Sequence, residues 1–323
     1  MEVATTKKLM VFSGSAHEAL AKEVCDLLQV PLGHRKLSRF ANGEIYVRFD
    51  DSVRGADVFV IQSHSAPINE HIMEQLVMID ALKRASAKRI TAVVPFFPYS
   101  RQDKKALSRE PISARLIGDL FTAAGTDRIV SIDLHSAQIQ GFVDMPFDHL
   151  LAVPLIVDYL KDRLVGEPIT MVSPDAGRVK MLERYGRHMD APIAIVHKRR
   201  SATEHNTAHA LDVVGEVEGR TCVIMDDIVD TAGTLCAAAD LLADRGARHV
   251  FAAATHGVLS PASHARLASS AFEEVIITNS LPVPDGLVLD KLKVLSIAPL
   301  LAGALDAIFM DRSVSGLFHG EHF

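Results

Sequence analysis

The stretch TCVIMDDIVDTAGT, residues 221–234, contains the pattern from which the fold can be inferred. Five mostly apolar residues are followed by two adjacent aspartates, Asp226 and Asp227, and then by a short turn of small and hydroxylated residues. A continuous apolar run of this length is typical of a parallel strand covered on both faces. Beyond the turn, apolar residues recur at helical spacing from Leu235 to Leu242. The stretch therefore predicts a strand, a tight turn and a helix, with both carboxylates at the carboxyl end of the strand.

Apolar runs of the same kind recur along the chain, and each is bounded by Gly, Pro or Ser. They lie at residues 9–13, 57–63, 89–96, 128–134 and 169–174. Helical patterns fill the intervals, as in residues 69–85 and in the helix that Pro111 opens and Gly125 closes. Alternating strands and helices predict an α/β fold with a mostly parallel sheet flanked by helices.

The two halves of the chain repeat this pattern at a nearly constant offset. The matched pairs are residues 9–15 with 169–175, 54–63 with 218–227, and 87–94 with 247–254. Chance similarity among hydrophobic strands is the alternative, but the second pair also matches glycine with glycine. The repeat predicts two similar domains, residues 1–155 and 156–323, and we expect the terminal segment to pack back on the N-terminal domain.

The acid pair belongs to the second copy of the repeat and not to the first. Where the second half has Asp226 and Asp227, the first half has Gln62 and Ser63. Because the same strand is predicted without the aspartates, the fold does not require them, and they indicate a site. Ligands of open α/β sheets bind at the carboxyl ends of strands, where these carboxylates are expected.

The turn after the acid pair, residues 228–234, is suited to binding a phosphate. Backbone N–H groups and the dipole at a helix N-terminus attract anions, Gly233 permits a close approach, and the threonine hydroxyls donate further hydrogen bonds. The two carboxylates can accept hydrogen bonds from neighbouring sugar hydroxyls. The alternative is that Asp227 or Asp230 only caps the helix, but capping does not need the preceding acid pair. Together these features predict a site for a phosphorylated pentose.

Composition and charge limit the classes of protein that fit. The 323 residues are 48% hydrophobic and 23% charged, which is typical of a globular protein of two ordinary domains. The net charge of -6 argues against a broad nucleic-acid surface. Three cysteines without a CxxC pair are expected to be core residues in a reducing compartment. The apolar run after Lys7 and Lys8 is too short for a signal peptide, and the longest apolar stretch is too short for a membrane span. We expect a cytoplasmic protein with no nucleic-acid or membrane partner.

Six segments in order make the chain, from residue 8 to about 318, similar to the ribose-phosphate pyrophosphokinase family. They are FANGE (40–44), PFFPYSRQDKK (95–105), SIDLHSAQIQGF (131–142), VSPDAG (172–177), HKRR (197–200) and DDIVDTAGT (226–234). The last segment also resembles the phosphoribosyl-pyrophosphate signature of type I phosphoribosyltransferases. The resemblance implies two phosphoribosyltransferase-like domains and a ribose-phosphate diphosphokinase. Such an enzyme, with Mg2+, transfers the β,γ-diphosphoryl group of ATP to the C1 hydroxyl of ribose 5-phosphate. The products are AMP and 5-phosphoribosyl 1-pyrophosphate, which serves nucleotide biosynthesis.

The resemblance assigns the site residues to four groups. The ATP-binding residues are Phe40, Asn42, Gly43, Glu44, Arg101 and Gln102. The residues that bind ribose 5-phosphate are Arg200, Asp226, Asp227, Asp230, Thr231, Ala232, Gly233 and Thr234. The catalytic residues are Lys198 and Arg200, and the magnesium ligands are His135 and Asp175.

Taken alone, several of these segments have simpler explanations. Residues 40–44 are typical of a hairpin with Asn-Gly at its tip, and the basic run 101–105 is typical of a solvated face. A lone histidine such as His135 is more often structural than a ligand, and Asp175 is also explained as a cap of the next helix. The polar stretch 201–210 indicates either a mobile lid or a plain surface loop. Neither GxxxxGKS nor GxxxxGKT occurs, so a P-loop does not explain ATP binding.

The family also implies an assembly and effectors. Its members form dimers that stack into homohexamers, with effector sites between subunits where free phosphate activates and ADP inhibits. The effector-site residues implied here are Ser52, Arg54, Gln140, Ser313 and Ser315. The chain departs from the family at Ser201, where proline is common, and at His149, where asparagine is common. Two alternative functions stay open: a phosphoribosyltransferase that consumes the product, and a catalytically silent subunit that regulates an active synthetase.

Overall fold

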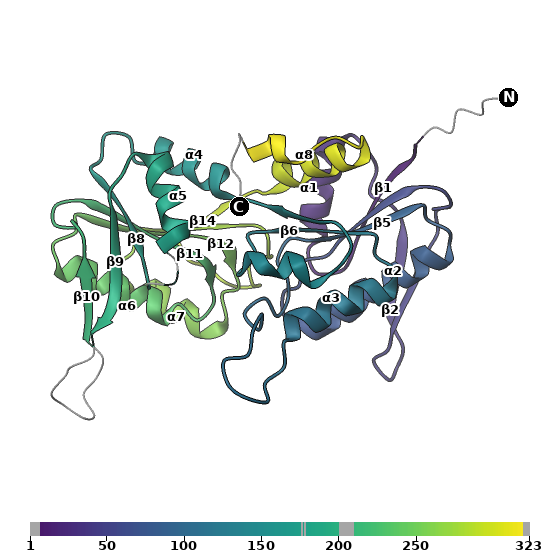
Figure 1. Cartoon of the computed structure of the whole chain (residues 1–323), viewed down its shortest axis with the longest axis horizontal. Helices are drawn as coiled ribbons and strands as arrows, with labels where there is room; N and C mark the ends of the chain where they lie inside the picture. The colour runs from purple at the N-terminus through teal and green to yellow at the C-terminus, as the bar shows by residue number, and fades with distance from the viewer. Residues whose placement is uncertain (1–6, 176, 178, 200–209, 319–323) are drawn as a thin grey trace. The chain divides into compact units, whose positions relative to one another are not determined.

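The computed structural model describes residues 7–175, 177, 179–199 and 210–318. The chain divides into two compact units, and in each of them helices lie against a largely parallel sheet (Figure 1). The first unit is formed by residues 1–151, 280–282 and 296–323, and the second by residues 152–279 and 283–295. The predicted α/β class is therefore confirmed for both units.

In the described part of the first unit, five parallel strands form one sheet. In spatial order they are β1 (Leu9–Ser13), β4 (Asp57–Ile61), β5 (Arg89–Val94), β6 (Arg128–Ile132) and β7 (Phe147–Leu150). The helices are α1 (Glu18–Leu28), α2 (Ile68–Arg84), α3 (Ser113–Ala124) and α8 (Ala298–Phe309), with short 3-10 helices η1 (Ala137–Phe142) and η3 (Ser315–Phe318). An antiparallel hairpin is formed by β2 (Arg35–Arg39) and β3 (Ile45–Phe49).

In the described part of the second unit, seven strands form one sheet that is parallel except at one edge. In spatial order they are β10 (Ala210–Val214), β9 (Ile193–Arg199), β8 (Ile169–Ser173), β11 (Thr221–Val229), β12 (His249–Gly257), β13 (Glu274–Thr278) and β14 (Leu292–Leu295). The helices are α4 (Val153–Arg163), α5 (Val179–Met189), α6 (Gly233–Asp244) and α7 (Pro261–Ser269). The edge strand β10 runs antiparallel to β9.

Local sequence rules account for these elements. Every residue of β4 is buried, as expected when helices cover both faces of a strand. Helix α3 ends at Gly125, which takes the left-handed conformation (φ 108°) that glycine adopts most readily. The three cysteines, Cys25, Cys222 and Cys236, are all free and buried, as small core residues are.

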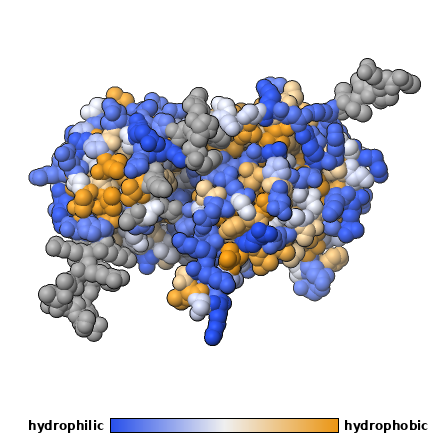
Figure 2. Space-filling view, in the orientation of Figure 1, coloured by the Kyte–Doolittle hydropathy of each residue, from blue (hydrophilic) through white to orange (hydrophobic). Residues whose placement is uncertain are grey.

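The surface has the mixed character of an ordinary globular protein. On the face drawn in Figure 2, apolar residues form separate patches among hydrophilic ones. Within the described ranges, none of the helices combines the length and the apolar character that a membrane span requires.

Candidate active site

The acid pair lies in β11, the middle strand of the seven-stranded sheet. Pairing with β8 runs from Thr221 to Ile224, whereas pairing with β12 continues to Val229. The strand therefore continues beyond Asp226 and Asp227, where the sequence pattern ended it, because β12 supplies a longer partner. On the β8 side, both carboxylates lie past the last paired residue and so at the carboxyl edge of the sheet.

The two carboxylates differ in burial. Asp227 is 5% exposed, whereas Asp226 is half-buried, and the backbone N–H of Asp227 donates to Oδ1 of Asp226 at 2.9 Å. Adjacent side chains on a strand point to opposite faces of the sheet. One ligand can therefore reach both carboxylates only from the edge of the sheet, which is where the strand turns toward α6.

Residues 230–235, called here the 230–235 turn, lead from β11 into α6. The first intrahelical bond runs from the N–H of Cys236 to the carbonyl of Ala232 at 2.9 Å. The N–H groups of Gly233, Thr234 and Leu235 precede it, so helix geometry supplies them with no intrahelical acceptor. Ala232 is in the left-handed region (φ 58°), a conformation that costs a residue with a Cβ about 1–3 kcal/mol and concentrates at ligand sites. This geometry is that of an anion site at a helix N-terminus.

A segment that the sequence did not single out, residues 259–266, holds this turn. The N–H of Leu259 donates to the Val229 carbonyl at 3.0 Å, and the hydroxyl of Ser260 donates to Oδ1 of Asp230. Nη1 of Arg266 donates to the Thr231 carbonyl at 2.8 Å. The segment follows β12, and its role becomes visible only once β12 is known to lie beside β11.

Asp175 lies just beyond β8, at the carboxyl edge that also carries the acid pair. Its side chain is exposed, and Oδ1 accepts a hydrogen bond from the N–H of Gly177 at 2.7 Å. The hydroxyl of Ser173 donates to the Asp175 carbonyl at 2.6 Å, which further orders this loop. The second unit thus brings three carboxylates to one edge of one sheet.

His135 belongs to the first unit, where it follows β6 and is half-buried. Nearby, Nε2 of His149 accepts a hydrogen bond from the N–H of Leu134 at 2.8 Å. His149, one of the two departures from the family, therefore orients the backbone next to His135. In the described part of the chain, no three His, Cys, Asp or Glu side chains form a group ready for a metal ion. The assignment of His135 and Asp175 to magnesium stays a prediction.

Residues 40–44 form the tip of the β2–β3 hairpin, as the sequence pattern indicated. Gly43 is in the left-handed region (φ 91°), and the side chain of Asn42 accepts the N–H of Glu44 at 3.2 Å. Phe40 is 54% exposed and packs edge-on against Tyr46, with ring centroids 5.7 Å apart. The hairpin therefore presents an exposed aromatic face beside polar groups, which suits a nucleobase.

Arg101 and Gln102 lie in the first unit beyond β5, and both are exposed. The side-chain carbonyl of Gln102 accepts the hydroxyl of Ser113 at 2.6 Å, at the start of α3. The next residue, Asp103, is buried and accepts Nε2 of Gln138 at 2.7 Å. These two bonds fix the segment that carries Arg101.

The predicted catalytic residues are only partly covered by the structure. Lys198 occupies a position in β9 opposite Leu211 of β10. Arg200 and residues 201–209 of the predicted lid (201–210) lie outside the described residues. The predicted effector residues all belong to the first unit, at exposed positions except for half-buried Gln140; they are Ser52, Arg54, Gln140, Ser313 and Ser315.

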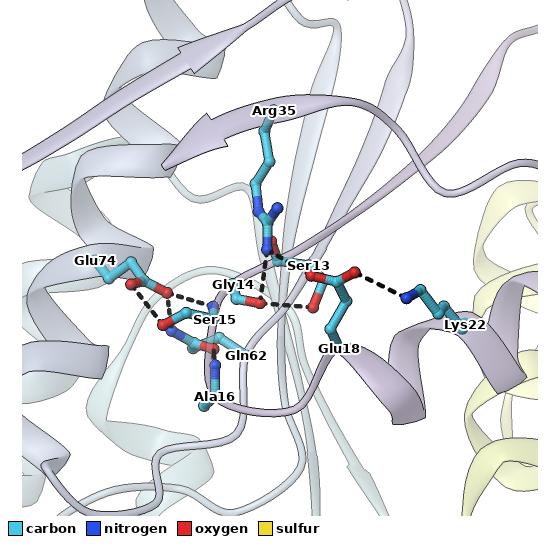
Figure 3. Close-up of polar contacts among 9 residues, drawn as sticks. All are labelled: Ser13, Gly14, Ser15, Ala16, Glu18, Lys22, Arg35, Gln62 and Glu74. Atoms are coloured by element: carbon cyan, nitrogen blue, oxygen red, sulfur yellow. Dashed lines mark hydrogen bonds and ion pairs between the residues drawn. The ribbon is translucent and has the colours of Figure 1, made fainter. Parts of the chain in front are cut away.

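In the first unit, the position that corresponds to the acid pair is filled by the protein itself (Figure 3). The carboxylate of Glu74, 2% exposed, reaches from α2 to the loop after β1. It accepts the N–H and hydroxyl of Ser15 at 2.6 and 2.8 Å, and Nε2 of Gln62 at 2.6 Å. The loop packs so closely that a Cβ on Gly14 would lie 2.3 Å from Gln62. In the first unit, the carboxylate of Glu74 thus lies at the sheet edge that corresponds to the edge carrying the acid pair in the second unit.

The fold and these sites define a class: a protein of two phosphoribosyltransferase-like domains, in which the second carries the acid pair before a helix start whose geometry suits an anion. Residues 9–125 match the N-terminal domain of ribose phosphate pyrophosphokinase, and residues 171–319 match the phosphoribosyl synthetase-associated domain. The chain belongs to the ribose-phosphate pyrophosphokinase family.

Whole-length relatives agree with this placement. Ribose-phosphate pyrophosphokinase of Streptomyces avermitilis is 56% identical over 97% of this chain and 96% of its own length. The protein of the same name from Mycobacterium leprae is 54% identical over 98% of this chain and 97% of its own length. The crystal structure of phosphoribosylpyrophosphate synthetase from Mycobacterium smegmatis is similar with a TM-score of 0.90 at 52% identity, covering 94% of this chain and 100% of that one.

Proposed function

We propose that this chain transfers the β,γ-diphosphoryl group of ATP to the C1 hydroxyl of ribose 5-phosphate. The hydroxyl oxygen attacks the β-phosphorus, the bond from that phosphorus to the α,β-bridging oxygen breaks, and AMP leaves while the hydroxyl proton is released. The observation that carries the proposal is the acid pair before the helix start of α6, in a chain similar over its full length to ribose-phosphate pyrophosphokinases.

The second unit binds the sugar phosphate in this proposal. Asp226 and Asp227 accept the ribose hydroxyls from the edge of the sheet, because their side chains leave opposite faces of β11. The 5-phosphate is bound by the N–H groups of the 230–235 turn, with the hydroxyls of Thr231 and Thr234 as further donors. Asp230 is held by Ser260 and shapes the turn.

The first unit binds ATP. Phe40 stacks on the adenine, Asn42, Gly43 and Glu44 contact it through polar groups of the hairpin tip, and Arg101 and Gln102 bind the phosphates. We further propose that the two units correspond to the domains predicted at residues 1–155 and 156–323, with the terminal segment packed back on the N-terminal domain. The assignment of residues 296–323, which include α8, to the first unit supports this.

Mg2+ suits the oxygen donors of this chain. Carboxylates are the ligands that magnesium prefers, and Asp175 lies with the acid pair at one sheet edge; His135 is a less usual ligand for so hard a cation. When bound, the ion neutralises charge on the triphosphate. Lys198 and Arg200 stabilise the charge that develops on the bridging oxygen as AMP leaves. Closure of the predicted lid, residues 201–210, excludes water from the site.

The proposal extends to assembly and location. We place the protein in the cytoplasm, where free buried thiols such as its three cysteines are stable. We also propose that the chain assembles as a homohexamer built from dimers. Phosphate and ADP act as its effectors and bind at the five predicted effector residues.

The test is an assay of the purified chain with Mg2+, ATP and ribose 5-phosphate, in which AMP must form only when the sugar is present. Nucleobase-dependent release of pyrophosphate would support a phosphoribosyltransferase instead, and absence of AMP would support a silent subunit.

We expect Lys198→Ala to lower kcat by about 100-fold or more while ATP binding changes less than about threefold. Isothermal titration with ATP measures the binding, and Lys161→Ala, on the exposed end of α4, is the matched control. Joint loss of binding and turnover would contradict the assigned role.

A further inference from the structure

We infer that Arg266 is a positioning residue for ribose 5-phosphate binding, acting through the Thr231 carbonyl to hold the 230–235 turn in its anion-binding shape. This inference rests on the proposed function. Arg266 lies on α7, outside every segment that marked the site in the sequence. It is exposed and stands beside the entrance of α6, where a Cβ on Gly233 would lie 3.5 Å from its Nη1.

The direction of the hydrogen bond explains how Arg266 acts. Its guanidinium donates to the carbonyl of Thr231 at 2.8 Å. In a planar trans peptide the carbonyl and the following N–H point in opposite directions. Fixing the Thr231 carbonyl on Arg266 therefore directs the N–H of Ala232 away from Arg266. A left-handed residue followed by helical ones directs successive N–H groups into one concavity, which attracts anions.

The bond opposes a specific distortion of the turn. Ala232 is strained in the left-handed region (φ 58°, ψ 7°), and such strain persists only where surrounding contacts hold it. Rotation of the 231–232 peptide would release the strain and turn the Ala232 N–H out of the concavity. The rotation would break the bond to Arg266, which is charge-assisted and so stronger than a neutral one. Ser260, which belongs to the same 259–266 segment as Arg266, holds Asp230, the residue before Thr231.

Substitution of Arg266 should therefore affect one substrate more than the other. In Arg266→Met, which keeps the apolar stem and removes the guanidinium, we expect the KM for ribose 5-phosphate to rise about tenfold, or about 1.4 kcal/mol. The KM for ATP should stay within about twofold, and kcat should fall less than KM rises, because the turn binds the phosphate and not the reacting atoms. Arg266→Lys keeps a charged donor of similar reach and should recover most of the affinity.

A matched control is present at the far end of α6, the helix that the 230–235 turn leads into. Arg245 is the C-cap residue of α6, is exposed, and pairs with Asp212 at 2.8 Å. Arg245→Met also removes one exposed guanidinium, but at the opposite end of α6 from the turn, and should leave the KM for ribose 5-phosphate unchanged. Hydrogen exchange of the peptide spanning residues 229–236 supplies a readout without turnover. Exchange of this peptide should become faster in Arg266→Met, while exchange in the rest of the second unit should stay unchanged.

The outcomes separate this inference from the proposed function. If the native chain forms no AMP with ribose 5-phosphate, the proposed function fails whatever Arg266 does. If the native chain is active, an unchanged KM for ribose 5-phosphate in Arg266→Met overturns the inference. Equal losses for both substrates, a matching loss in Arg245→Met, or faster exchange throughout the second unit would also overturn it, since each indicates a general structural role.

Discussion

His64 is a buried histidine of the first unit whose titration predicts a loss of stability in acid. It is 1% exposed, and its ring lies 6.2 Å from that of Phe121. Among the described residues, neither ring nitrogen finds a well-formed hydrogen bond, although the Gln75 side chain and the Phe96 backbone lie close enough to favour the proton in part. Burial, and secondarily the neighbouring His71, lower the pKa of His64 to about 3.

The sign of the effect follows from the two protonation states. A histidine in the unfolded chain has a pKa of about 6.5. Between that pH and about pH 3, the unfolded chain binds a proton at His64 that the folded chain does not, so the free energy of unfolding falls as the pH falls. Each pH unit below about 6.5 corresponds to about 1.4 kcal/mol, so on the order of 2–3 kcal/mol is lost at pH 4.5 relative to neutral pH.

The substitution His64→Leu removes the titrating group and keeps an apolar side chain against Phe121. As the pH falls from 7 to 4.5, we expect the free energy of unfolding of the variant, relative to that of the native chain, to rise by on the order of 2–3 kcal/mol. Hydrogen exchange of peptides from β4 and α2, compared at equal pH, measures this opening free energy locally. His34→Leu, at a histidine whose side chain is 81% exposed, is the control and should show little change. A His64→Leu difference that stays constant with pH would refute the reasoning.

Two further predictions concern the loops at the sheet edges. In the first unit, Glu74→Ala leaves the buried amide of Gln62 and the partly buried donors of Ser15 without their acceptor, and should lower the free energy of unfolding by about 2–4 kcal/mol in urea denaturation. Glu70→Ala, on the exposed surface of the same helix, should cost less than about 1 kcal/mol, and similar losses in both variants would argue against the network. In the second unit, Ala232→Gly should stabilise the turn by about 1 kcal/mol, whereas Ala232→Val should destabilise it and raise the KM for ribose 5-phosphate. Equal thermal midpoints for the two Ala232 variants would contradict the left-handed strain.

The elements that sequence predicted well are those that depend on local information. The strand at 57–61 is recognisable because an unbroken apolar run can be satisfied only by burial on both faces. The end of α3 at Gly125 follows from the backbone freedom of a single residue. The repeat between the halves also needs no structure, because it compares the chain with itself.

The contacts that sequence missed join residues far apart in the chain. Arg266 reaches Thr231 only because β12 pairs with β11 and delivers α7 beside α6. Glu74 reaches Ser15 for the same kind of reason, because β1 and β4 are neighbours in the sheet. Neither side chain belongs to a motif, and no spacing along the chain relates it to its partner.

The amino-acid sequence by itself determined the α/β class, the internal repeat and the positions of the acid pair and its turn, since hydrophobic periodicity and turn chemistry act over a few neighbouring residues. Tertiary structure alone decided the order of the strands, the extension of β11 to Val229, the closure of the first unit's edge by Glu74 and the contact of Arg266 with the 230–235 turn. These features depend on which strands pair and in which register, and that choice is made by the packing of the whole unit.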